Sequence, residues 1–167
     1  MIEVLISIFV LLIGIVGTMG LFINSLKNSM DARDNVIATQ LAQEGIELVR
    51  NIRDTNLAVG KPAFDTGTGL PAFNLSPSCS ISYGDTTINC SSATFPLYIS
   101  AGGYYTHTAG GTATKFKRQI IVDTKTANQL TVTSEVIWLG ASGSFPAVAS
   151  CTTANKCIAA KVTLITK

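Results

Sequence analysis

An apolar run at the beginning of the chain constrains its fold more than any other feature. Residues 4–26 contain no ionisable side chain. As a helix at ~1.5 Å per residue they would reach roughly 34 Å, which is enough to cross the hydrocarbon of a bilayer. The run therefore predicts a membrane-spanning helix, and one carboxylate, Glu3, stands directly before it.

A cleaved secretory signal is the alternative explanation of this run. Such a signal has a basic first region, a shorter apolar core and a cleavage site made of small residues. Here the first charge is acidic, and residues 21–23 continue the apolar run. We therefore expect the segment to be retained.

A polar helix follows the apolar run without a break. Its apolar residues recur at steps of seven and four and form one stripe: Met30, Ile37, Leu41, Leu48 and Ile52. Small residues that allow a sheet or another helix to approach closely accompany the stripe: Ala38, Ala42 and Gly45. Because no proline precedes Pro62, we expect a single helix over residues 1–54.

The second half of the chain has the pattern of a sheet. Residues 55–105 are rich in Gly, Pro, Ser, Thr and Asn, and they predict a long loop with short strands near residues 79–88 and 97–100. β-Branched and alternating residues predict three stronger strands, at residues 115–124, 129–139 and 159–166. A short polar turn separates the first two, so these should form an antiparallel hairpin.

The whole pattern predicts an α+β fold in which a long N-terminal spine helix packs on a C-terminal antiparallel β-sheet. We divide the chain into an apolar stem (residues 1–26), an amphipathic helix packed on the sheet (27–54) and a globular head (55–167). Its 167 residues suit one domain with a buried core. The net charge is only +2, so nothing indicates a large basic surface for nucleic acid.

Four cysteines lie beyond the apolar run, and none belongs to a C-x-x-C pair typical of zinc or thioredoxin chemistry. Two disulfides outside the cytosol fit them best, although three pairings are possible and four buried thiols are the alternative. We favour Cys79–Cys90 and Cys151–Cys157, because each bond closes a short polar loop at low entropic cost.

The opening of the chain resembles the type IV pilin and pseudopilin family. The resemblance lies in the tip, IEVLISIFVLLIG, where an acid directly precedes an uncharged stem, and in LAQEGIELVRNIRD farther along the helix. It implies the pilin fold and a precursor that a prepilin peptidase cuts at the membrane, often with methylation of the new amino terminus. It also implies that the subunit polymerises into a helical filament with the stems at its centre.

The same resemblance implies a role for Glu3, which would pair with the terminal amine of a neighbouring subunit. A lone carboxylate in an apolar core costs several kcal/mol unless it finds such a partner. The residues expected to pack in the filament core are Val4, Leu5, Ile8, Phe9 and Leu12. Family members usually begin with Phe-Thr-Leu-Ile before the acid, so one hypothesis is that Met1 corresponds to the third mature residue.

Three glycines interrupt the stem at Gly14, Gly17 and Gly20. Each costs a helix about 1 kcal/mol relative to alanine. They predict local melting of the stem in a filament, close packing against other helices, or both.

Other candidate sites have simpler structural interpretations. His107 is the sole histidine, and we expect it to be a solvated loop residue rather than a catalytic one. Asp65 and Asp85 could offer oxygens to calcium, but no third carboxylate clusters with them, and we expect no metal or other cofactor. Tyr104 and Tyr105 mark either an adhesive surface or the edge of the core.

A basic and aromatic cluster is the best candidate for DNA binding: Lys115, Phe116, Lys117 and Arg118. A strand with its polar side chains in water explains the same residues, and we prefer that interpretation.

The sequence thus favours a structural subunit over an enzyme. The leading prediction is the major subunit of an extracellular type IV pilus-like filament, held in the cytoplasmic membrane until an inner-membrane assembly platform adds it to the filament. A minor pilin or a type II secretion pseudopilin is the alternative within the family. A single-pass membrane-anchored binding domain that never polymerises is the alternative outside it. Motility, adhesion and DNA uptake are not separated by these residues.

Overall fold

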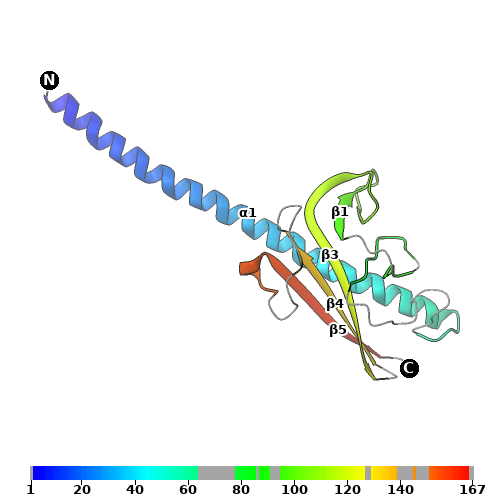
Figure 1. Cartoon of the computed structure of the whole chain (residues 1–167). Helices are drawn as coiled ribbons and strands as arrows, with labels where there is room; N and C mark the ends of the chain where they lie inside the picture. The colour runs from blue at the N-terminus through cyan, green and yellow to red at the C-terminus, as the bar shows by residue number, and fades with distance from the viewer. Residues whose placement is uncertain are drawn as a thin grey trace. The chain divides into compact units, whose positions relative to one another are not determined.

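The computed structural model describes residues 2–63, 78–85, 87–90, 95–126, 129–138, 145 and 151–165. They form one helix and a five-stranded antiparallel sheet, which is the predicted α+β architecture (Figure 1). The chain divides into two compact units, Met1–Val36 and Ile37–Lys167. The first unit is a single helical segment, and the second holds the remainder of that helix and the whole sheet.

Helix α1 runs from Ile2–Ala58 as one uninterrupted element. It ends slightly beyond the predicted position, because the chain reverses only at Gly60, which has a φ of 74°. Glycine adopts this left-handed conformation without the penalty that a Cβ would bring. The amide of Lys61 then donates a 2.9 Å hydrogen bond to the carbonyl of Asn56, which satisfies one of the last helical acceptors.

The sheet has the order β2-β1-β3-β4-β5, and every neighbouring pair is antiparallel. Its strands are β1 (Pro96–Ile99), β2 (Tyr105–Thr106), β3 (Thr112–Thr126), β4 (Gln129–Ile137) and β5 (Cys157–Ile165). A short 3-10 helix, η2 (Thr153–Asn155), precedes β5. The three stronger predicted strands and the hairpin between β3 and β4 are confirmed, with ends shifted by a few residues.

The strand predicted near residues 79–88 is wrong. That segment forms only two isolated bridges, Cys79 with Ile120 and Ser80 with Asn89. A tight turn interrupts it, in which the carboxylate of Asp85 accepts a 2.7 Å hydrogen bond from the amide of Ser82. This hydrogen bond gives the Asp85 side chain a structural role in the turn. Asp65 lies outside the described residues.

Residues 37–58 of α1 cover one face of the sheet and form the core of the second unit. Two clusters of buried apolar side chains lie at this contact. One contains Leu41, Leu97, Phe116, Val136 and Trp138, and the other contains Ile46, Val49, Ile120, Val132 and Leu164. The predicted stripe is confirmed from Ile37 onward, whereas Met30 belongs to the first unit.

Gly45 permits the helix to lie this close to the sheet. A methyl group at this position would overlap the hydroxyl of Ser134 and would approach the Cδ1 atom of Ile120 to 3.0 Å. Ala38 and Ala42 are fully buried on the same side of α1. Small residues beside the apolar stripe therefore have the role that the sequence predicted for them.

Arg118 lies inside the core, where the sequence predicted a solvated cation. Its guanidinium is fully buried and donates hydrogen bonds to the carbonyls of Leu41 (3.1 Å) and Ile81 (2.8 Å). It also forms an ion pair with Glu44 at 3.3 Å. Strand alternation puts Arg118 on the same face as Phe116, so the predicted basic cluster is divided between the two faces of β3.

His107 is also buried, which contradicts the prediction of a solvated loop residue. Its backbone amide donates to the Ser82 hydroxyl at 3.0 Å, and its Nδ1 lies 3.2 Å from the Pro96 carbonyl, as expected of a neutral ring that carries its proton on Nδ1. Burial, and then the nearby charge of Arg118, lower the pKa of His107 from 6.5 to about 4.

The buried histidine predicts a specific acid sensitivity. Between pH 6.5 and about 4 the unfolded chain binds a proton at His107 that the folded chain excludes. The free energy of unfolding should therefore fall by up to about 3 kcal/mol as the pH drops through this window. Urea unfolding of the full chain in detergent, followed by the fluorescence of Trp138, measures the change.

Replacement of His107 with glutamine is the matched control, because an amide can still donate to Pro96 but does not titrate. The difference between the unfolding free energies of this variant and the original chain should change steadily from pH 6.5 to 4. A difference that is the same at every pH would contradict a neutral, buried His107.

Candidate assembly surface

The stem of α1 is apolar and open on all sides of the helix within its own unit. The residues predicted to pack in a filament are between 52% and 67% exposed: Val4, Leu5, Ile8, Phe9 and Leu12. Monomeric soluble proteins rarely expose a continuous apolar surface of this kind. Exposure of the stem is thus consistent with a segment that inserts into a membrane.

Two hydroxyl groups of the stem, those of Ser7 and Thr18, are compatible with an apolar environment. Ser7 donates a 2.8 Å hydrogen bond to the carbonyl of Glu3, and Thr18 donates a 2.9 Å bond to the carbonyl of Ile15. Both hydroxyls are thus satisfied within the helix, as happens in membrane-spanning helices. By length and composition, α1 is able to cross a membrane.

Glu3 is the single ionisable side chain of the described stem, and it lies in the first turn of α1. The unpaired backbone amides at a helix N-terminus favour a negative charge there, by about 0.3–1 kcal/mol at exposed positions. That gain is smaller than the cost of burying a carboxylate, so a buried Glu3 still requires a cation.

The three stem glycines lie within continuous helix. A methyl group at Gly14, Gly17 or Gly20 would contact nothing within 4 Å apart from the helix itself. Within the first unit, therefore, no contact requires glycine at these positions. Melting and close packing both remain predictions about an assembled state.

Two disulfides staple the second unit: Cys79–Cys90 and Cys151–Cys157, with S–S distances of 2.00 and 1.98 Å. This is the pairing that the short loop lengths favoured. The bond between Cys79 and Cys90 ties the segment that bridges to β3, and the bond between Cys151 and Cys157 closes the loop that contains η2.

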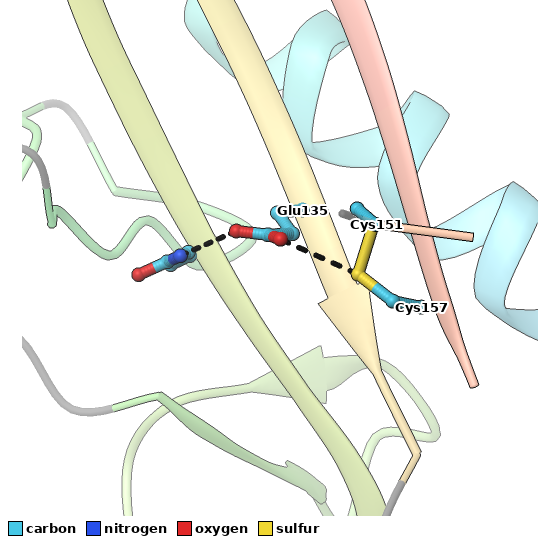
Figure 2. Close-up of a disulfide and its surroundings, with 4 residues drawn as sticks. Glu135, Cys151 and Cys157 are labelled. Atoms are coloured by element: carbon cyan, nitrogen blue, oxygen red, sulfur yellow. Dashed lines mark hydrogen bonds between the residues drawn. A yellow bond between two sulfur atoms is a disulfide. The ribbon is translucent and has the colours of Figure 1, made fainter. Parts of the chain in front are cut away.

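A buried carboxylate contacts the second of these bonds (Figure 2). Glu135 lies on the face of β4 opposite α1, is fully buried, and accepts a hydrogen bond from the side-chain amide of Gln119 on the neighbouring strand. Its other oxygen lies 3.3 Å from Sγ of Cys157. Burial raises the pKa of Glu135, and the bond from Gln119 offsets this in part.

Glu135, Cys151 and Cys157 together have the spacing of three metal ligands. Thiolates bind metals, whereas sulfurs joined in a disulfide have no thiolate to offer, so the oxidised cluster is not a metal site. Glu135 was not among the predicted site residues, because strand alternation does not show whether the face opposite the core is covered. The one signal was a charge within an otherwise uncharged strand.

The two tyrosines considered for adhesion have different environments. Tyr105 packs against the core cluster around Trp138. Tyr104 is 45% exposed, and its ring lies against that of Tyr83, with centroids 5.3 Å apart. Tyr105 is thus the edge of the core, and Tyr104 is a surface residue.

The exposed stem of α1, with its single carboxylate at the tip, is the surface best suited to assembly among the described residues. Comparison of the chain with family models, with curated proteins and with solved structures found no match.

Proposed function

We propose that this chain is a structural subunit of an extracellular type IV pilus-like filament. The observation that carries the proposal is the first part of α1, an exposed apolar helix that begins with one carboxylate and continues into a disulfide-stapled domain. The membrane holds the stem before assembly, and the stems of neighbouring subunits replace lipid around it in the filament.

The position of Glu3 supports this proposal over a plain membrane anchor. An anchor has no need of a carboxylate at its tip, and burying one costs free energy. In a filament, pairing of Glu3 with the terminal amine of a neighbouring subunit offsets that cost and sets the axial register. The proposal therefore gives the acid a role that anchoring alone does not.

The composition of the second unit supports a non-catalytic role. Its one histidine is buried and neutral, and its four cysteines are paired in disulfides. Assembly would therefore use free energy from a separate assembly platform in the inner membrane, after a prepilin peptidase has processed the precursor.

Shearing of filaments from cells that make the chain tests the proposal. The sheared fraction is imaged by electron microscopy with an antibody against the second unit, and its protein content is measured by mass spectrometry. Cells from which the gene has been deleted are the control. We expect labelled filaments along their whole length and this chain as the dominant protein.

The other outcomes separate the alternatives. Labelling at filament tips, or trace amounts in a fraction dominated by another protein, indicates a minor pilin or a pseudopilin. Recovery of the chain in the membrane fraction alone, with unchanged filaments in the deletion strain, would overturn the proposal in favour of a membrane-anchored binding domain.

A further inference from the structure

The two sulfurs of the bond between Cys151 and Cys157 differ in their surroundings. Cys157 is fully buried at the start of β5, whereas Cys151 is partly exposed. Cys151 is therefore the half of the bond nearer to solvent, where we expect a thiol from solvent to attack. Attack on Cys151 would make Cys157 the leaving group.

Glu135 contacts the sulfur that would leave. Its Oε1 lies 3.3 Å from Sγ of Cys157, and Figure 2 shows the carboxyl group directed at this sulfur. A disulfide sulfur carries no proton, so this contact is a hydrogen bond only while Glu135 is protonated. The side-chain amide of Gln119 donates to the other oxygen and holds the group in place.

We propose that the bond between Cys151 and Cys157 is a site of thiol–disulfide exchange in which Glu135 donates a proton to the departing Cys157 sulfur. A solvent thiolate attacks Sγ of Cys151, the S–S bond breaks, and its electron pair goes to Cys157. The proton of Glu135 converts that sulfur into a thiol. The products are a mixed disulfide on Cys151, a Cys157 thiol and a Glu135 carboxylate.

A second thiolate then attacks the mixed disulfide at the sulfur of the reductant and releases Cys151. The reductant is thus oxidised to its own disulfide, and the electrons balance. The raised pKa of Glu135 supports the proposal, because the acid keeps its proton at pH values where an exposed glutamate has lost it. The charged residues that alternation places on its face of the sheet include Lys115, Lys117 and Asp123 on β3 and Lys161 on β5.

The consequence of exchange would be local. The bond closes a loop with a sequence separation of 6, which contains η2 and lies directly before β5. Reduction would release this loop while the bond between Cys79 and Cys90 remains. The proposal does not depend on polymerisation, because it uses only the second unit.

Glutathione is the probe that tests the site of attack. The full chain in detergent is treated with reduced glutathione, quenched with acid and mapped by mass spectrometry. We expect the mixed disulfide on Cys151 and not on Cys157. Glutathione attached mainly to Cys157 would overturn the proposed direction of exchange.

The rate of reduction by dithiothreitol tests the role of Glu135. In the Glu135→Gln variant, opening of the bond between Cys151 and Cys157 should slow by about ten-fold. This effect is smaller than is usual for general acid catalysis, because a thiolate is already a good leaving group without protonation. The bond between Cys79 and Cys90 in the same molecule is the internal control and should open at an unchanged rate.

A purely structural role for Glu135 would give the opposite result, because loosening of the sheet would speed reduction. A second measurement needs no variant. In the original chain, the rate constant per dithiothreitol thiolate should fall as the pH rises through the pKa of Glu135. An unchanged or faster rate in Glu135→Gln, or a rate constant independent of pH, would contradict proton donation.

Discussion

Replacement of Glu3 with alanine should leave the second unit folded and reduce filament assembly by about ten-fold or more. The expected loss follows from burial of the stem, in which a charge pair contributes several kcal/mol relative to its broken form. The number and length of sheared filaments, measured by electron microscopy against the amount of chain in the membrane, give the result. Far-UV circular dichroism checks that the variant is folded.

Two further variants identify the cause. Glu3→Gln keeps the size of the side chain and removes its charge, so it should assemble as poorly as Glu3→Ala if the charge is what matters. Glu47→Ala removes an exposed carboxylate from the same helix, where it pairs with Arg50 on the helix surface. This control should assemble normally. Normal filaments from both Glu3 variants would refute the role given to this residue.

Removal of Arg118 should cause the largest loss of stability of any charge in the second unit. The guanidinium joins three segments that are distant in sequence, with separations of 77 residues to Leu41 and 37 to Ile81. Truncation to alanine leaves a cavity and an unpaired carbonyl at Ile81, and breaks the pair with Glu44. We expect a decrease of about 3–5 kcal/mol in the free energy of unfolding.

Arg118→Met separates the contribution of the charge to stability from that of side-chain packing, because methionine fills most of the volume of the arginine side chain. It should recover part of the loss but still cost about 1–3 kcal/mol, the penalty for a buried acceptor without a donor. Lys117→Ala, which removes the adjacent cation on the opposite face of β3, should change stability by less than about 1 kcal/mol. Urea unfolding followed by Trp138 fluorescence checks all three variants. Equal effects at positions 117 and 118 would contradict the proposed role of the buried Arg118 in joining these segments.

Much of the fold could be predicted from the sequence because its signals are local. The apolar run, the stripe from Ile37 to Ile52 and the absence of proline before Pro62 determine a long helix without reference to the rest of the chain. The same is true of β4, where alternation places Leu130, Val132 and Val136 on the core face. Loop length alone indicated the disulfide pairing.

The errors concern polar residues whose partners are distant in sequence. Burial of Arg118 depends on carbonyls supplied by α1 and by the segment around Ile81. No pattern in the sequence near Arg118 predicts these partners. His107 is buried because the hydroxyl of Ser82 and the carbonyl of Pro96 meet it. Burial of Glu135 was not predicted either, because alternation shows which face a residue occupies but not whether that face is covered.

The end of the helix was misplaced for a related reason. Polar residues after Asp54 indicated a stop, but Asn56 is buried and its amide donates to the carbonyl of Ala63. A partner beyond the turn thus allows α1 to continue to Ala58. The apolar stem of α1 was visible in the sequence, because residues 4–26 contain no ionisable side chain.

Helical reconstruction of sheared filaments by cryo-electron microscopy tests the central claim most directly. We expect density for this chain in every subunit, with residues 4–26 of neighbouring copies packed together at the filament centre. The Glu3 carboxylate should lie within ion-pair distance of a terminal amine from an adjacent copy. A filament without this chain, or one in which the stems contact lipid rather than each other, would contradict the proposal.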